Sequence, residues 1–269
     1  MLTYRDTDPG GGPDAVVLLH GLLVDGGLWD GVVERLDRRC VVPELPLGCH
    51  PAPLAAGAER TAPGLARMVA ELLDHLDLRD VTLVGNDTGG AIAQLVAADH
   101  GERVGRLVLT PCDTYEDFLP KIFRPLQWAS RVPGGLTAAV MPLKPVPALR
   151  RLPFAFGRLI KRPAPHRAWV DRCLDAFLKG DRGVRRDAAR FTAAIDPAVT
   201  LGVAERLRAF TRPVLLAWAP EDRSFRLANA ERLAAALPDA RIERIEDSYT
   251  FVSLDQPART AELIAAFAG

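Results

Sequence analysis

The 269-residue sequence has no excess of either charge, because its 34 Lys and Arg balance its 34 Asp and Glu. A neutral chain offers no electrostatic footprint for nucleic acid or for an anionic membrane. It also lacks long hydrophobic runs: stretches such as residues 15–19 are far shorter than the roughly 20 residues that cross a bilayer. We therefore expect a soluble cytoplasmic protein that binds neither nucleic acid nor a membrane. The composition leaves its oligomeric state open.

Metal-ligand and cofactor motifs are absent as well. The four cysteines form no CxxC pair, and no GxGxxG motif follows an apolar, strand-like run. Nothing in these patterns predicts a zinc site, a disulfide framework or a dinucleotide site. We expect reduced thiols, no metal, no organic cofactor, and a small-molecule substrate or ligand as the partner.

Short apolar runs alternate with amphipathic segments of helical length. This alternation is typical of an α/β protein whose mostly parallel sheet is flanked by helices. The predicted strands lie at residues 15–19, 40–42, 81–84, 106–109, 213–218 and 240–245, and the predicted helices near 64–76, 91–100, 227–237 and 258–267.

The alternation stops after residue 109 and resumes only at residue 213. The intervening stretch shows helical periodicity broken by prolines, best at residues 118–130, 168–178 and 184–195. A structureless loop of that length is implausible in a compact domain. We therefore predict a core of residues 1–113 and 213–269, with residues 114–212 inserted as a helical cap.

The segment Gly85-Asn86-Asp87-Thr88-Gly89-Gly90 joins a predicted strand directly to a predicted helix. A strand, a G-x-nucleophile-x-G turn and a helix are the context of a nucleophile elbow, in which glycines permit a very tight turn. An aspartate before a helix also serves as an N-cap, but the flanking elements favour the elbow. We expect Asp87 to be strained, accessible, and ionised by the positive helix end.

The loop after the first long strand begins with His20-Gly21. In an elbow architecture this loop supplies one backbone N–H of an oxyanion hole, here that of Leu22, and Thr88 supplies the other. We interpret His20 as a structural histidine that holds the loop. Trp29, further along the loop, either packs or lines the pocket, and packing is favoured.

Trp218-Ala219-Pro220-Glu221-Asp222 follows the fifth predicted strand. A carboxylate at this place orients the histidine of a catalytic triad. Asp222 matches better than its neighbour Glu221, and the alternative for either is a solvated loop acid.

Taken in order, these motifs resemble the α/β-hydrolase superfamily over essentially the whole chain. The aspartate at the elbow resembles the haloalkane dehalogenase and epoxide hydrolase branches. The resemblance implies an α/β-hydrolase fold with an inserted helical lid, Asp87 as a nucleophile that forms an ester with carbon, and Asp222 as the orienting acid. It also implies a histidine that activates the water hydrolysing that ester.

That histidine is missing. The matching segment reads Asp247-Ser248-Tyr249-Thr250-Phe251-Val252, with Thr250 at the histidine position, and no histidine follows His166. Threonine has no pKa near neutrality and cannot take a proton from water. An ester on Asp87 should therefore persist or hydrolyse slowly. His50, His166 and Tyr249 are alternative proton-transfer groups, although structural roles explain each of them better.

Other features of the resembling branches are weak. Epoxide hydrolases use two lid tyrosines, whereas only Tyr115 is available here; dehalogenases have a halide-binding tryptophan where Thr88 stands. The possible pocket residues are His20, Trp29, Asn86, Trp128, Trp169, Tyr249 and Thr250.

Three functions follow. The first is a hydrolase acting on a small or medium apolar electrophile through Asp87. The second is a lyase, isomerase or cyclase that uses Asp87 as a general base. The third is a non-catalytic ligand-binding protein.

Overall fold

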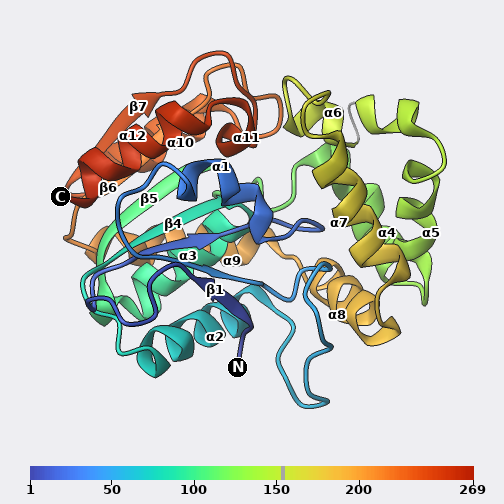
Figure 1. Ribbon diagram of the computed structural model, residues 1–269, viewed down its shortest axis with the longest axis horizontal. Helices are drawn as coiled ribbons and strands as arrows, with labels where there is room; N and C mark the ends of the chain where they lie inside the picture. Colours follow the sequence, from blue (N-terminus) through green and yellow to red (C-terminus); the bar gives the residue numbers. More distant parts are fainter. Residues whose placement is uncertain (153–154) are drawn as a thin grey trace.

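The computed structural model describes residues 1–152 and 155–269, in which seven strands form one sheet (Figure 1). Their order is β1-β3-β2-β4-β5-β6-β7, and every neighbouring pair is parallel except β1 with β3. The six predicted strands are confirmed; β1 was missed because three residues carry too little periodic signal. The strands are β1 (Tyr4–Asp6), β2 (Val16–Leu19), β3 (Cys40–Pro43), β4 (Val81–Asp87), β5 (Val104–Cys112), β6 (Val214–Trp218) and β7 (Ala240–Arg244).

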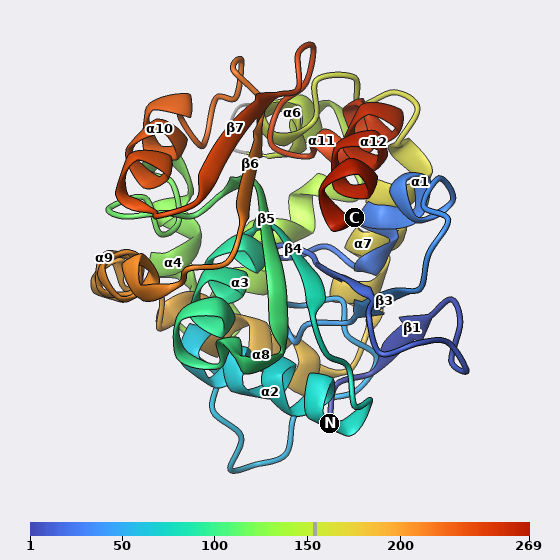
Figure 2. The same cartoon turned by 90° about the vertical axis from the view of Figure 1, so that its left-hand side faces the viewer.

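The central strands are apolar and buried on both faces, as parallel strands covered by helices should be. One face packs against α2 (Ala62–His75), α3 (Thr88–Asp99) and α10 (Leu227–Ala236), and the other against α1 (Asp30–Val33) and α12 (Pro257–Ala268) (Figure 2). The short helix α11 (Val252–Asp255) and the turn η1 (Gly26–Trp29) pack with α1 and α12, whereas the turn η2 (Gly101–Arg103) packs against α3. Among the described residues, no helix is long and apolar enough to cross a membrane.

Helices inserted between β5 and β6 gather beyond one end of the sheet (Figure 1). They are η3 (Lys121–Phe123), α4 (Arg124–Ser130), α5 (Gly135–Val140), η4 (Met141–Leu143), η5 (Pro147–Arg151), α6 (Phe156–Leu159), α7 (Arg167–Lys179) and α8 (Arg182–Ala193). The last inserted helix, α9 (Pro197–Arg206), packs instead on α3 of the core and leads through η6 (Leu207–Ala209) to β6. We keep the name cap segment for residues 114–212, whose limits as a domain remain a prediction.

The first helix of the cap segment starts later than predicted. Residues 118–130 were expected to be helical, but helical structure begins at Lys121. The residue before a proline avoids the helical conformation, and Leu119, which precedes Pro120, has a φ of +64°. The helices predicted at 168–178 and 184–195 correspond to α7 and α8.

Candidate active site

Asp87 stands at the junction of β4 and α3 with φ +52° and ψ −130°. The chain is tight here: a Cβ at Gly85 would lie 2.6 Å from the Gly89 carbonyl oxygen, and a Cβ at Gly89 would lie 2.5 Å from the carbonyl oxygens of Leu19 and His20. The predicted strained turn and the need for its glycines are confirmed. The Asp87 side chain makes no capping hydrogen bond to α3, so the N-cap interpretation is wrong.

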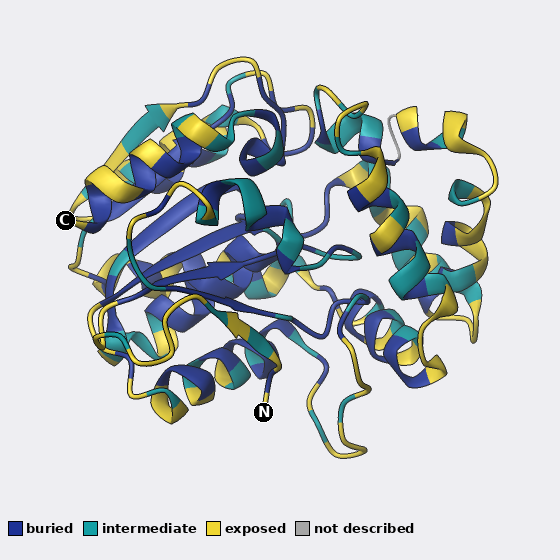
Figure 3. Cartoon of the chain, viewed as in Figure 1, coloured by how far each residue is buried: buried dark blue, intermediate teal, exposed yellow. Residues whose placement is uncertain are grey.

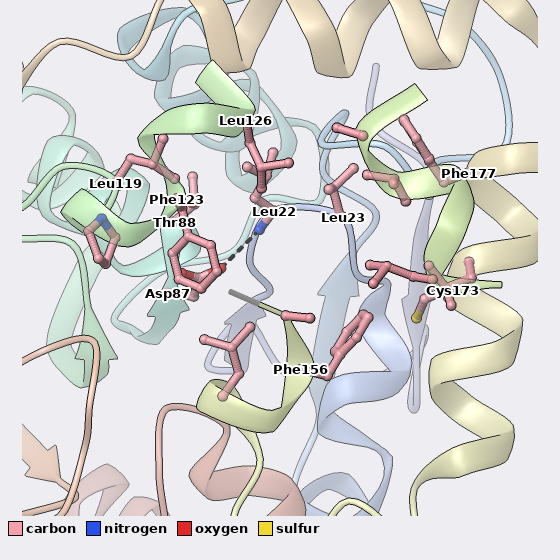
Figure 4. Close-up of a pocket in the computed structure, with 17 residues that line it drawn as sticks. Leu22, Leu23, Asp87, Thr88, Leu119, Phe123, Leu126, Phe156, Cys173 and Phe177 are labelled. Atoms are coloured by element: carbon pink, nitrogen blue, oxygen red, sulfur yellow. Dashed lines mark hydrogen bonds between the residues drawn. The ribbon is translucent and has the colours of Figure 1, made fainter. Parts of the chain in front are cut away.

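The Leu22 backbone N–H donates a hydrogen bond of 3.1 Å to Asp87 Oδ2 (Figure 4). A Cβ at Gly21 would lie 2.0 Å from the same oxygen, so this loop approaches the carboxylate closely only because Gly21 has no side chain. The predicted donor loop is therefore next to the elbow. With one carboxylate oxygen held, the other is left for chemistry in the pocket that Asp87 lines.

The expectation that Asp87 is ionised needs correction. Its side chain is half-buried in an apolar pocket. Burial raises the pKa of Asp87 to about 7, the Leu22 and Thr88 amides lower it, and the charge of Asp222 raises it further. Desolvation therefore outweighs the helix end, and both protonation states are populated at neutral pH.

His20 holds the loop rather than facing the pocket. It is fully buried, its Nε2 accepts the Leu45 N–H at 2.9 Å, and its Nδ1 lies 2.9 Å from the Gly21 carbonyl oxygen. Both ring nitrogens thus contact the backbone of the neighbouring loops, in agreement with the structural role proposed for His20. Trp29 is fully buried outside the pocket, in the hydrophobic core, so its favoured packing role agrees with the structure.

Asp222 follows β6 and is buried, whereas its neighbour Glu221 is exposed and pairs with Lys161 at 2.7 Å. The N–H groups of Ser224 and Phe225 donate to Asp222 Oδ1 at 2.6 and 2.5 Å. Burial raises the pKa of Asp222 to about 6, against the lowering effect of these amides and of the Thr250 hydroxyl. Asp222, not Glu221, thus has the environment of a functional acid.

Thr250 is fully buried beside Asp222 and does not line the pocket. Among the described residues, neither its Oγ1 nor Asp222 Oδ2 has a hydrogen-bond partner of good geometry. Asn86 ties this segment to the elbow, since its Nδ2 donates to the carbonyl oxygens of Thr250 and Pro111 at 2.8 and 3.1 Å. Asn86 therefore lies behind the elbow, and its assignment as a pocket residue is wrong.

A cavity of about 130 Å³ separates the elbow from the cap segment (Figure 4). A dry cavity of roughly 150 Å³ accommodates a molecule the size of benzene. Apart from Asp87, Thr88 and Cys173, its wall is aliphatic or aromatic: Leu22, Leu23, Leu119, Pro120, Phe123, Leu126, Ala139, Val140, Leu143, Ala155, Phe156, Leu159, Leu174 and Phe177.

The aromatic residues expected at the pocket do not line it. Trp128 is 61% exposed on the outside of α4, because the opposite face of that helix points inward. Trp169 donates through Nε1 to Asp25 at 2.8 Å. Tyr249 lies beneath the Arg223 guanidinium at 4.5 Å, and Tyr115 beneath that of Arg232 at 3.7 Å. All four are structural or surface residues.

The remaining histidines also stay outside the pocket. His50 is buried with its Nε2 3.6 Å from Asp187 of α8, which Arg60 also contacts. Burial lowers the pKa of His166, which is half-buried near Asp255. Neither faces Asp87 as a base.

Asp113, at the end of β5, was missed by the sequence interpretation. It is fully buried, accepts the Leu119 N–H at 2.8 Å and lies 3.2 Å from the Thr88 hydroxyl. Burial raises its pKa well above the usual range, and the charge of Asp87 adds to this effect. Its place offered a signal: β4, β5 and β6 are adjacent parallel strands, so acids after each of them meet at one edge.

Comparison with known proteins shows which family this chain is similar to. A model of the alpha/beta hydrolase fold family matches residues 14–257. Haloalkane dehalogenase 2 of Mycobacterium tuberculosis (strain H37Rv) is 30% identical over 267 residues, covering 96% of this chain and 88% of the relative.

Solved structures agree with the fold. A thermophilic esterase from Thermogutta terrifontis is 21% identical with a TM-score of 0.76, covering 98% of this chain and 92% of the esterase. The enol-lactonase from Burkholderia xenovorans LB400 is 20% identical with a TM-score of 0.75, covering 99% and 95% of the two chains.

Proposed function

The chain belongs to the alpha/beta hydrolase fold family, in its haloalkane-dehalogenase-like branch, and we propose that its Asp87 attacks a small apolar electrophile held in the pocket. The observation that carries this proposal is the Leu22 N–H on Asp87 Oδ2 at the apex of a strained elbow that lines an apolar cavity. Such a turn costs free energy that a scaffold alone does not require.

The chemistry begins with the ionised form of Asp87. Its free carboxylate oxygen attacks the electrophilic carbon, a C–O bond forms, and the bond from that carbon to its leaving group breaks with the electron pair departing on the leaving group. The Leu22 N–H stabilises the other oxygen, and the Thr88 amide also favours the ionised carboxylate. The cavity favours an apolar substrate about the size of benzene, and the name of the mycobacterial relative makes a haloalkane the first compound to test.

Hydrolysis of the resulting ester is the slow step in this proposal. Thr250 cannot accept a proton from water, and among the described residues no histidine lines the pocket. Asp222, whose pKa burial raises to about 6, is buried and does not line the pocket either, so it can assist hydrolysis only weakly. We therefore expect the ester to accumulate.

Intact-mass measurement tests the proposal directly. The protein is incubated with small haloalkanes, epoxides and activated esters, alongside Asp87→Asn and, as a matched control, Asp14→Asn at an exposed loop position. A single adduct on the wild type and on Asp14→Asn, absent from Asp87→Asn and mapped to the elbow peptide, supports the nucleophile. Absence of adduct with every electrophile rejects it.

One observation favours a second candidate, a non-hydrolytic enzyme that uses Asp87 as a general base. A base works best when its pKa lies near the operating pH, and that of Asp87 is about 7. Proton abstraction leaves no ester and needs no activated water. This function predicts that the protein catalyses hydrogen–deuterium exchange of weakly acidic apolar ligands without forming an adduct. The exchange should be lost in Asp87→Asn.

A further inference from the structure

The outer face of the cap segment carries a stripe of basic and apolar side chains. Lys121, Arg124, Trp128, Arg131 and Val132 are separated by three or four residues along η3, α4 and the turn after it, so they share one side of the helix. All five are exposed, Trp128 by 61% and Val132 by 60%. We call them the basic–aromatic stripe.

The opposite side of the same helix faces the cavity. Phe123 and Leu126 line the pocket (Figure 4) and alternate with the stripe along the helix. A single helix thus separates the apolar cavity from the outer surface. Further exposed apolar side chains follow nearby, Met141 in η4 and Val146 before η5, and η4 packs against α5, which in turn packs against α4. Exposed residues follow this outer edge in Figure 3.

Charge in the chain is distributed unevenly. The cap segment has 19 Lys and Arg against 8 Asp and Glu, and the rest of the chain has 15 against 26. Between Asp117 and Asp171 there are ten basic residues and no acidic residue. The zero net charge therefore averages two oppositely charged segments, and it no longer argues against binding to an anionic surface.

The basic residues of the stripe are free to meet such a surface. Within the described part of the chain, Lys121, Arg124 and Arg131 form no salt bridge. By contrast, Lys144 and Arg150 deeper in the cap segment are paired with Asp171. The unpaired charges thus lie on either side of Trp128, the most exposed large apolar side chain of the cap segment.

We propose that the basic–aromatic stripe docks on an anionic lipid surface, with Trp128 at the headgroup level. Tryptophan flanked by basic residues is the composition of interfacial helices, in which apolar side chains enter the headgroup boundary and basic ones bind anionic lipids. A protein partner ordinarily offers charges of both signs, whereas this face is basic throughout. Docking places the helix that covers the pocket against the reservoir in which apolar molecules dissolve.

Vesicle binding tests this inference independently of the reaction. The full chain is mixed with vesicles of phosphatidylcholine alone or with one third phosphatidylglycerol, at low and high salt, and sedimented. Trp29, Trp169 and Trp218 are buried, so a blue shift of fluorescence reports Trp128. We expect binding and a blue shift only with phosphatidylglycerol at low salt, because salt screens exposed charges.

Two variants and a matched control locate the contact. Each basic residue near the surface contributes about fivefold to binding, so Arg124→Glu/Arg131→Glu should weaken vesicle binding by about 25-fold or more. Trp128→Ser should abolish the blue shift. Arg241→Glu/Arg244→Glu makes the same charge change on exposed residues of β7, away from the cap segment (Figure 1), and should bind like the wild type.

Three outcomes would overturn the inference. They are absence of vesicle binding at low salt, equal weakening by the β7 control, and binding to polyglutamate in preference to vesicles, which would identify an acidic protein as the partner. Circular dichroism of each variant separates loss of binding from loss of fold.

Discussion

The two halves of the site differ in how completely they are built. Around Asp87 the strained turn, its close-packed glycines and the Leu22 N–H are all present. Around Asp222 the acid is buried and hydrogen-bonded to backbone amides, but Thr250 beside it has no proton-accepting group. The backbone features of the elbow are thus present without the histidine side chain, and under the proposed function the ester on Asp87 should hydrolyse slowly.

Restoring the missing side chain is the change with the largest expected effect. In Thr250→His the imidazole replaces a hydroxyl beside Asp222, whose Oδ2 has no hydrogen-bond partner among the described residues. A positioned general base contributes about 10²- to 10⁴-fold, so release of the alkyl group from Asp87 should accelerate by that factor in single-turnover mass measurements.

The control for this repair removes its partner. Thr250→His combined with Asp222→Asn should lose most of the gain, because the ring is then no longer oriented. Thr250→Val, in which valine has nearly the shape of threonine, serves as a second control. Equal ester lifetimes in Thr250→His and Thr250→Val would show that hydrolysis is slow for a reason other than the absent imidazole.

The pH dependence of alkylation tests how far the two halves are coupled. The reactive form of Asp87 is the carboxylate, so the rate of adduct formation should rise about tenfold per pH unit below a midpoint of about 7 and level off above it. Asp222→Asn should move the midpoint down, because the charge of Asp222 raises the pKa of Asp87. Initial rates from quenched samples give the profile, and a rate independent of pH would contradict the role of Asp87 as the titrating nucleophile.

The elbow was predictable because its constraints are local. Glycine spacing, a strand before the turn and a helix after it define the elbow within a few residues. The pocket wall was not predictable in this way: Trp128 and Trp169 occupy helices whose facing direction is set by packing between helices, and both point away from the cavity. Asp113 lies in no motif, and only the pairing of β4 with β5 brings it to Asp87.

Substituting a close-packed glycine of the elbow should lower the stability of the protein. In Gly89→Ala the new Cβ would lie 2.5 Å from two backbone carbonyl oxygens, and backbone cannot yield as a flexible side chain does. We expect a loss of about 3 kcal/mol of unfolding free energy in urea titrations. Gly202→Ala, within α9 with only the Arg206 side chain nearby at 3.3 Å, should instead gain up to about 1 kcal/mol. Similar stability of the two variants would mean that the elbow is not tightly packed.

Removing the Asp87 charge should have the smallest effect, and one of opposite sign. The pKa of Asp87 rises from 3.8 to about 7 on folding, so its neutral form stabilises the native state below the unfolded pKa. That stabilisation is lost as pH rises towards the native pKa, because the unfolded chain ionises first. Asp87→Asn cannot ionise, and asparagine tolerates a positive φ. Near pH 8 we therefore expect its free energy of unfolding to exceed that of the wild type by about 2 kcal/mol, which is less than the pKa shift alone implies because solvent reaches the half-buried group. Near pH 4 we expect almost no difference. Thermal melts at both pH values measure the difference, with Asp14→Asn, at an exposed position, expected to show none. An equal gain at both pH values would trace the effect to packing and not to the charge of Asp87.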